Sequence, residues 1–270
     1  MKNPFIASIL FVCCAFNMAA QSDIPFRNYA YTSDIMPKGH FRYSLFSNTE
    51  YGLTDNITIA AHPLWLFLSP SVEARWELLQ KNNYAVSVYH GIVCPTPILS
   101  LVSRKGTGGF ISPEFEIPFM LSLRNGVLST YNLAPEQRLT GEFEFEFALF
   151  NDALEPGSSI DLPIISPRNA VYYKNAGLNL ALGMEGKIRG KFDYYSKAEV
   201  FLFPFKDEEY KVEYGNTSSY FGEMTGLAFW NIARKFKLGF GGRLSYGDYP
   251  FGTQWHLLPM LDFVKYVGKK

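Results

Sequence analysis

The stretch that decides the fold alternates charged and apolar side chains at every second position: Glu142-Phe143-Glu144-Phe145-Glu146-Phe147-Ala148-Leu149-Phe150. Successive side chains of a β-strand point to opposite faces, so the three glutamates share one face and the odd-numbered apolar residues share the other. In a helix, with its period of 3.6 residues, both kinds would be mixed on every face. The stretch therefore predicts a strand that separates a polar from an apolar environment.

The same period of two recurs along most of the chain. In residues 72–78, for example, Glu73, Arg75 and Glu77 alternate with apolar residues, and in residues 111–123 Glu114 and Glu116 do so. Together with 142–150, we expect about twelve strands, at residues 40–46, 57–67, 72–78, 84–93, 111–123, 127–133, 178–187, 192–202, 220–232, 235–246 and 255–266.

The segments between these strands fall into two kinds. Short turn signals occur at residues 54–56, 81–83, 124–126 and 247–250, each carrying Asn, Asp or Gly. Longer connections are expected at residues 104–109, 134–140, 151–175 and 204–219. Short links imply antiparallel neighbours, and neither an internal repeat nor a linker marks a second domain.

The composition excludes two broad classes of protein. The chain has 270 residues, 47% hydrophobic and 17% aromatic, with 25 basic and 25 acidic residues. Intrinsic disorder needs low hydrophobicity and high net charge, and nucleic-acid binding needs a clustered basic face. We therefore expect a folded chain with no nucleic-acid partner. The mean hydropathy is nevertheless only −0.03, because charged residues alternate with the aromatic ones.

The N-terminus has the pattern of a secretory signal peptide. Lys2 precedes an apolar run over residues 4–16, and small residues end at Ala20, which predicts cleavage of residues 1–20. Lipid attachment at Cys13 or Cys14 fits less well, because bulky residues precede them. Removing residues 1–20 takes away one base and no acid, which leaves 24 basic and 25 acidic residues. Cys94 alone remains, so neither an intramolecular disulfide nor a four-cysteine zinc site is expected, and we assign no metal or cofactor.

Strand length distinguishes a membrane barrel from a soluble sheet. Residues 56–72 and 84–103 are uncharged, but their prolines and their Val, Ile and Tyr content favour strands over spanning helices. Several strands reach the roughly 9–11 residues that cross a bilayer, whereas soluble strands centre on about 5–6. Aromatic residues at strand ends would form interfacial girdles: Tyr84, Tyr220, Tyr246 and Trp255. A lipocalin-type soluble barrel would show the same alternation with its apolar face inward, so alternation by itself does not separate the two.

One hairpin carries a resemblance to a known group of proteins. Residues 49–57, Thr-Glu-Tyr-Gly-Leu-Thr-Asp-Asn-Ile, resemble a hairpin that recurs in Gram-negative outer-membrane β-barrels of the small porin and transporter kind. The resemblance implies an all-β, antiparallel transmembrane β-barrel of about twelve strands, within a range of about 10–14, in the bacterial outer membrane. Its partners would be outer-membrane lipid and the barrel assembly machinery. Such barrels typically end on an aromatic residue, whereas here Tyr266 is followed by residues 267–270.

These observations give a domain plan and a set of candidate site residues. We expect a signal peptide at 1–20, an N-terminal periplasmic segment at 21–38 and the barrel at 39–267. The charged strand faces would line the lumen. The candidates for that lining are Glu73, Arg75, Glu77, Glu114, Glu116, Glu142, Glu144, Glu146, Lys197, Glu199 and Arg243.

Three functional hypotheses follow from this lining. Acidic side chains around a pore favour cations, which predicts a passive pore or a transport or binding protein for a small solute. If the glutamates instead pair with arginine and lysine, the lumen is closed and the barrel is structural, or binds another envelope protein through residues 151–175 or 204–219. A lipid hydrolase would use a histidine such as His62 or His90, the latter near Ser87, but no signature joins these residues, and no catalytic residue is assigned.

Overall fold

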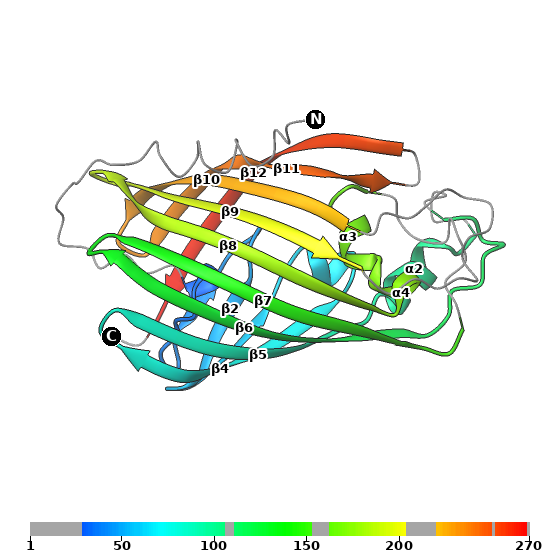
Figure 1. The fold of residues 1–270 in the computed structure, drawn as a ribbon, viewed down its shortest axis with the longest axis horizontal. Helices are drawn as coiled ribbons and strands as arrows, with labels where there is room; N and C mark the ends of the chain where they lie inside the picture. Colours follow the sequence, from blue (N-terminus) through cyan, green and yellow to red (C-terminus); the bar gives the residue numbers. More distant parts are fainter. Residues whose placement is uncertain (1–28, 106–110, 153–161, 204–219, 250–251, 269–270) are drawn as a thin grey trace.

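The strands form one closed antiparallel barrel. The structure, a computed structural model, describes residues 29–105, 111–152, 162–203, 220–249 and 252–268. Each strand pairs with its neighbours in sequence, and the barrel closes where the first strand pairs with the twelfth (Figure 1). The predicted fold class and the predicted number of strands are both confirmed.

The strands divide into a short group and a long group. The short strands are β1 (Phe41–Tyr43), β2 (Thr49–Thr54) and β3 (Ile57–Ala61). The long ones, of 10 to 16 residues, are β4 (Ser71–Lys81), β5 (Tyr84–Val93), β6 (Met120–Ala134), β7 (Gln137–Phe150), β8 (Ala176–Arg189), β9 (Phe192–Leu202), β10 (Tyr220–Ala233), β11 (Phe236–Tyr249) and β12 (Gly252–Val267). Only the long group reaches the roughly 9–11 residues that cross a bilayer.

Several predicted boundaries were wrong. Residues 124–126 lie inside β6, which merges the predicted strands 111–123 and 127–133, and residues 111–119 are outside any strand. Gly126 leaves the space that the Tyr89 ring occupies, because a Cβ at this position would lie 2.2 Å from Cζ of Tyr89. The predicted strand 57–67 ends at Ala61, and the predicted long connection 134–140 is a two-residue turn.

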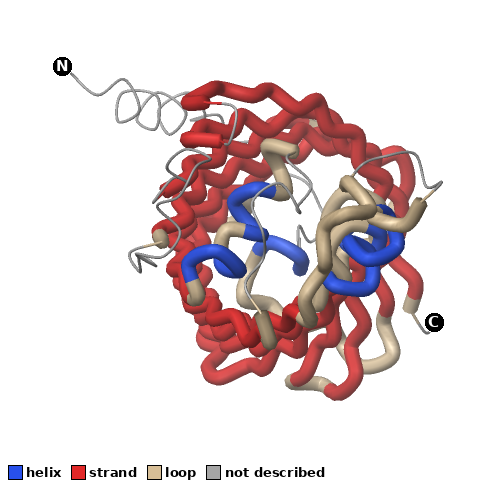
Figure 2. The backbone as a smooth tube through the Cα atoms, turned by 90° about the vertical axis from the view of Figure 1, so that its right-hand side faces the viewer, coloured by secondary structure: helices blue, strands red, loops and turns tan. Residues whose placement is uncertain are grey.

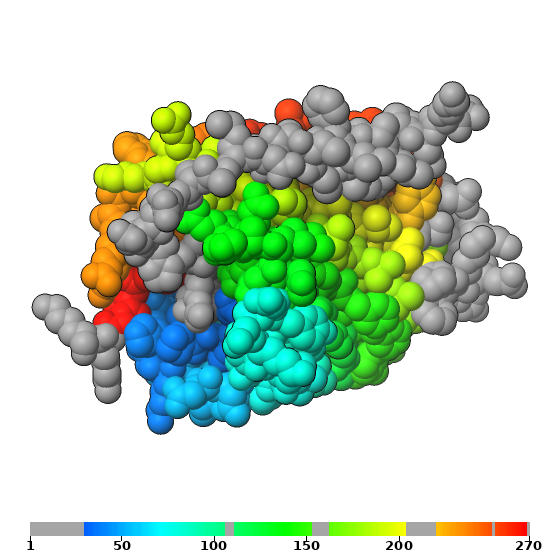
Figure 3. Space-filling model, turned by 60° about the vertical axis from the view of Figure 1, so that its left-hand side comes forward, coloured from blue at the N-terminus to red at the C-terminus, as the bar shows by residue number. Residues whose placement is uncertain are grey.

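The two ends of the barrel differ in their connections. Two-residue turns close one end, the turn end, at residues 55–56, 82–83, 135–136, 190–191 and 234–235. Longer connections lie at the other end, the mouth: 44–48, 62–70 and the described parts of 94–119 and 151–175; the predicted connection 204–219 lies outside the described residues. The first strands and the last ones meet along one side, as the oblique view from the turn end shows (Figure 3).

Helical turns lie within the ring of strands and at the mouth (Figure 2). They are η1 (Tyr29–Tyr31), η2 (Trp65–Phe67), α2 (Thr96–Val102), α3 (Ser166–Asn169) and α4 (Val171–Lys174). At the mouth, Leu99, Val171 and Tyr172 join a buried apolar cluster with strand residues such as Phe221. No helix in the described residues is long and apolar enough to cross a membrane.

The outer surface is apolar and bordered by aromatic residues. Large exposed apolar side chains occur around the wall, an arrangement that soluble monomers avoid and that lipid-facing barrels need. Aromatic side chains at the turn end are Tyr43, Tyr51, Tyr84, Tyr131, Phe192 and Trp230. At the mouth, Tyr246 contacts Tyr220 and Trp255, with ring centroids 6.5 and 4.5 Å apart. The four aromatic residues singled out from the sequence therefore lie at strand ends.

The segment just before β1 lies inside the barrel. The Tyr31 ring stacks on Tyr195 of β9 at 3.8 Å, and the backbone N–H of Ser33 donates to Thr130 Oγ1 at 2.8 Å. Asp34 forms an ion pair with Arg138 of β7. Residues 21–38 were predicted as an N-terminal periplasmic segment; within it, residues 30–36 lie in the lumen near the turn end, whereas Pro37 and Lys38 are exposed. The predicted signal peptide, residues 1–20, lies outside the described residues.

Candidate functional site

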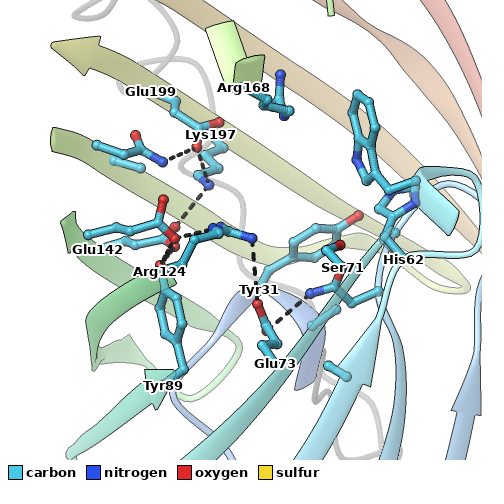
Figure 4. A pocket seen from close by; sticks show the side chains of 18 of the residues that line it. Tyr31, His62, Ser71, Glu73, Tyr89, Arg124, Glu142, Arg168, Lys197 and Glu199 are labelled. Atoms are coloured by element: carbon cyan, nitrogen blue, oxygen red, sulfur yellow. Dashed lines mark hydrogen bonds and ion pairs between the residues drawn. The ribbon is translucent and has the colours of Figure 1, made fainter. Parts of the chain in front are cut away.

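A cavity of about 210 Å³ lies in the middle of the barrel. Its lining comes from the long strands, from the inner N-terminal segment at Tyr31, from connection 62–70 at His62, and from α3 at Arg168 (Figure 4). Because lumen-facing residues of a strand recur every second position, the long strands β4 to β11 each contribute one or more polar side chains to this cavity, whereas β12 contributes Met260.

One wall of the cavity carries a continuous ion-pair network. Arg75 Nη2 lies 3.2 Å from Glu73 Oε1, both on β4. Arg124 of β6 reaches across β5 to β4, with Nη1 4.0 Å from Glu73 Oε2, and contacts the neighbouring strand β7, with Nη2 2.5 Å from Glu144 Oε2. Each charge in this part of the lumen therefore has an opposite charge beside it, as partly buried charges require.

The network continues through β7 to β9. Lys197 Nζ lies 2.9 Å from Glu142 Oε2 and 3.0 Å from Glu199 Oε1. The Tyr89 hydroxyl lies 2.8 Å from a carboxylate oxygen of Glu142 and 2.6 Å from one of Glu144, so it donates to either (Figure 4). Glu146, the third glutamate of the alternating stretch, accepts a hydrogen bond from Ser122.

The opposite side of the cavity is more basic. Arg168 of α3 forms a two-pronged pair with Glu223 of β10, at 3.0 and 2.8 Å, and its guanidinium lies 5.3 Å from the Trp65 ring centroid. Burial opposes the charge of Arg168, but the carboxylate of Glu223 outweighs it and raises the arginine pKa. Arg243 Nη1 lies 3.5 Å from the same carboxylate. The pairing fixes α3 across the lumen.

Two uncharged titratable groups complete the lining. Burial lowers the pKa of His62 to about 4, so its imidazole is neutral at pH 7. Burial, with the nearby Asp262 carboxylate, raises the pKa of Tyr31 to about 12. Both side chains therefore present neutral aromatic surface to the cavity.

The charges that line the cavity balance. The carboxylates are Glu73, Glu142, Glu144, Glu146 and Glu199, and the basic groups are Arg75, Arg124, Arg168, Lys197 and Arg243. The predicted excess of acid in the lumen is therefore absent from this cavity. Side chains of both signs are available to hydrogen-bond a solute there.

The structure brings together most of the candidates named from the sequence. Eight of them line the cavity: Glu73, Arg75, Glu142, Glu144, Glu146, Lys197, Glu199 and Arg243. Glu77 lies on β4 nearer the turn end, outside the cavity lining, and Glu114 and Glu116 are exposed in the segment before β6.

Three residues that line the cavity were missed. Arg124 was assigned to a turn, although the alternation of Leu121, Leu123 and Val127, interrupted at Asn125, would have placed it on a strand. Arg168 lies in the long connection before β8, where no period indicates which way a side chain points. Tyr89 was counted only as part of an uncharged strand.

The described residues provide little for metal or hydrolase chemistry. They contain no group of three or more His, Cys, Asp or Glu side chains placed to hold a metal ion. On β5, Ser87 is buried on the lumen face, whereas His90 is on the outer face with its Nδ1 2.7 Å from Asn125 Oδ1. The serine and the histidine that the hydrolase hypothesis paired therefore lie on opposite sides of the wall.

Comparison with known proteins adds a likeness in fold. No family model and no curated protein matches the chain. The structure of the COG4313 outer membrane channel from Pseudomonas putida F1 is similar over 90% of this chain and 100% of that one, with a TM-score of 0.53 and 9% identity. The fold is that of a bacterial outer-membrane β-barrel. The large exposed apolar side chains around the outer wall agree with that fold.

Two further channel structures show a weaker likeness to this barrel. They are the outer membrane channel DcaP of Acinetobacter baumannii (7% identity, TM-score 0.41, 83% of this chain) and the CymD monoaromatic hydrocarbon channel (9% identity, TM-score 0.35, 87% of this chain and 90% of that one). The chain spans 62% of the length of the DcaP channel.

Proposed function

We propose that this barrel is a passive channel for small solutes across the outer membrane. The observation that supports it best is the charge-balanced cavity in the middle of a lipid-facing barrel. A polar solute that leaves water must regain its hydrogen bonds, and the paired carboxylates and guanidinium groups supply both acceptors and donors. The channel function of the COG4313 protein, which shares the fold, agrees with this proposal.

The cavity limits the size and the charge of the solute. Its volume of about 210 Å³ is below the range of about 300–1,000 Å³ typical of drug-sized ligands. The inner segment narrows the lumen at the turn end and α3 narrows it toward the mouth. Because the lining charges balance, we expect weak ion selectivity in place of the cation preference that a ring of glutamates would give.

Neutralising the glutamates tests the proposal. In planar bilayers, changing Glu142, Glu144 and Glu146 together to glutamine leaves Glu73 and Glu199 as the carboxylates of the cavity lining against five basic groups, so the permeability ratio should move severalfold toward anions. The matched control is the double variant Glu114→Gln/Glu116→Gln, which removes exposed carboxylates outside the cavity and should leave selectivity unchanged. A wild-type barrel that neither conducts ions nor admits glycine in liposome swelling would contradict the proposal and favour a structural or partner-binding barrel.

A further inference from the structure

One side of the barrel wall has an incomplete strand ladder. β12 pairs with β11 along its length but with β1 only at residues 265–267. The neighbouring strands stop early: β1 ends at Tyr43 and β3 at Ala61. Within the described part of the chain, residues 257–264 of β12 thus have a strand partner on the β11 side alone. We call this region the seam: residues 257–264 with the connections 44–48 and 62–70 that lie beside it.

The seam lies at the depth of the membrane interior. On β12, Trp255 is at the level of the mouth aromatics, and Lys265 pairs with Tyr43 at the level of the turn-end aromatics. Residues 257–264 run between these levels. An open strand edge does not persist in lipid, and irregular backbone at this depth occurs where it is covered by protein or borders a water-filled cavity. The sequence fits an edge here, because Pro259 has no N–H to donate and proline in sheets is confined to edges and bulges.

The seam is covered unevenly. Near the turn end, Asp262 accepts hydrogen bonds from the backbone N–H groups of Leu45 and Phe46, at 3.1 and 3.0 Å, which hold connection 44–48 against β12. Nearer the mouth, Leu257 is 74% exposed, and its neighbour Leu258, on the lumen-facing side of the strand, is still 39% exposed. Both faces of β12 are therefore accessible there, which is not expected for a strand backed by a filled lumen.

The central cavity reaches the seam. Met260 of β12, Phe46 and His62 line the cavity, and these three residues lie in the seam. Val72 also lines it, although Val72 alternates with the lumen-facing Glu73 and is 47% exposed on the outer face of β4. Val72 lies just beyond the last pair between β3 and β4, Ala60 with Glu73, so the cavity extends to the wall at the point where connection 62–70 follows β3. The seam residues that line the cavity are of both kinds. Phe46, Trp65 and Met260 are apolar, whereas the Asn48 amide donates to Glu73 Oε1 at 3.2 Å, where the ion-pair network begins.

We propose that the seam is a side portal through which a small, mainly apolar molecule passes between the cavity and the outer leaflet of the membrane. The apolar body of such a molecule would contact Phe46, Trp65 and Met260, and a single polar group would hydrogen-bond the charged wall. The proposal rests on the proposed channel function and names a solute class for it. It adds a lateral route to the lengthwise path that ions and glycine would take.

Cysteine labelling tests whether the membrane reaches the cavity through the seam. In a Cys94→Ser background, Leu258→Cys is compared with Ala181→Cys, which lines the cavity from β8, a strand paired on both edges. A pyrene maleimide dissolved in the bilayer is concentrated there by more than about tenfold, because burying even two methylene groups gives that factor. We expect it to label Leu258→Cys at least about tenfold faster than Ala181→Cys. Equal rates would overturn the portal.

Transport of an apolar probe tests the route. Wild-type barrel in a Gram-negative host should speed the uptake of N-phenyl-1-naphthylamine, and the maleimide adduct at Leu258→Cys should abolish the increase. The same adduct at Leu182→Cys, on the lipid-facing side of β8, should leave it intact. Uptake that persists in the blocked Leu258→Cys protein overturns the portal. If ion conductance and glycine entry are retained in that case, the proposed channel function stands, whereas their absence from wild type refutes the channel itself.

Discussion

The wall from β4 to β11 and the wall around β12 and β1–β3 share an alternating sequence pattern but differ in backbone pairing. From β4 to β11, each strand is hydrogen-bonded on both edges, and the lumen carries ion pairs from strand to strand. Around β12 and β1–β3, the pattern still alternates, but the ladder is short and connections 44–48 and 62–70 lie in its place. The comparison teaches that alternation sets which way side chains point, whereas strand length sets whether the backbone is sealed.

The largest effect is expected from an ion pair on the sealed side. Arg138 of β7 is buried between Asp34 and Glu185. Arg138→Met leaves two carboxylates without their cation, and breaking a buried pair in this way costs about 3–5 kcal/mol. Urea unfolding in detergent micelles, followed by the loss of heat-modifiable migration, measures it. The control Lys81→Met, at an exposed position on β4, should be nearly neutral, and equal losses in both variants would contradict the assignment.

Proline distinguishes the sealed side from the seam directly. Leu180→Pro in β8 removes a ladder hydrogen bond and leaves a carbonyl without a donor in lipid, a loss of about 3 kcal/mol or more. Leu257→Pro should cost less than about 1 kcal/mol. Backbone N–H groups two residues apart point to the same edge of a strand, and Pro259 already has no N–H group on that edge, so the edge of Leu257 is expected to be the unpaired one. The same unfolding measurement applies. Similar losses in the two variants would show that the seam is sealed by hydrogen bonds.

An intermediate effect is expected where Tyr89 packs on β6. Gly126→Ala places a Cβ within 2.2 Å of the tyrosine ring, and overpacking of this kind costs about 1–3 kcal/mol. Gly141→Ala on the adjacent strand β7 meets nothing within 4 Å and is the matched control. In a Tyr89→Ala background the ring is absent, so adding Gly126→Ala should cause no further loss of stability. If Gly126→Ala is as stable as Gly141→Ala, the packing of the Tyr89 ring does not require a glycine at position 126.

The smallest effect is the pH dependence of the seam side. Because burial depresses the pKa of His62 to about 4 from an ordinary value of about 6.5, the unfolded chain binds more protons between these values. Stability contributed by this group is therefore present above pH 6.5 and is lost as the pH falls toward 4.

Unfolding midpoints at pH 7 and pH 5 measure this loss. We expect about 1–2 kcal/mol at pH 5, with His62→Gln insensitive over the same interval. Arg168 and Arg243 also disfavour the charged imidazolium of His62, whereas Asp262 favours it. Arg243→Gln should therefore reduce the difference in stability between pH 7 and pH 5. An identical pH response in wild type and His62→Gln would remove His62 as the cause.

The predicted strand count was correct through two errors that cancelled. The predicted strands 111–123 and 127–133 correspond to the single strand β6 (Met120–Ala134), and residues 49–54, taken as part of a hairpin, form a full strand of their own. Asn125-Gly126 has the composition of a turn, and only the position of the Tyr89 ring gives the glycine its other explanation. Glu114 and Glu116 follow the alternation of a strand, yet they are exposed outside the barrel wall.

The sequence by itself determined the strands and which side chains share a face, because a period of two residues fixes both locally. Strand length and the resemblance to outer-membrane barrels then placed Glu142, Glu144 and Glu146 in the lumen. Only the tertiary structure decided how those charges are neutralised, that residues 30–36 fold inward, and that β12 keeps an open edge. These depend on contacts between segments far apart in the chain, such as Arg168 with Glu223, and no local pattern carries that information.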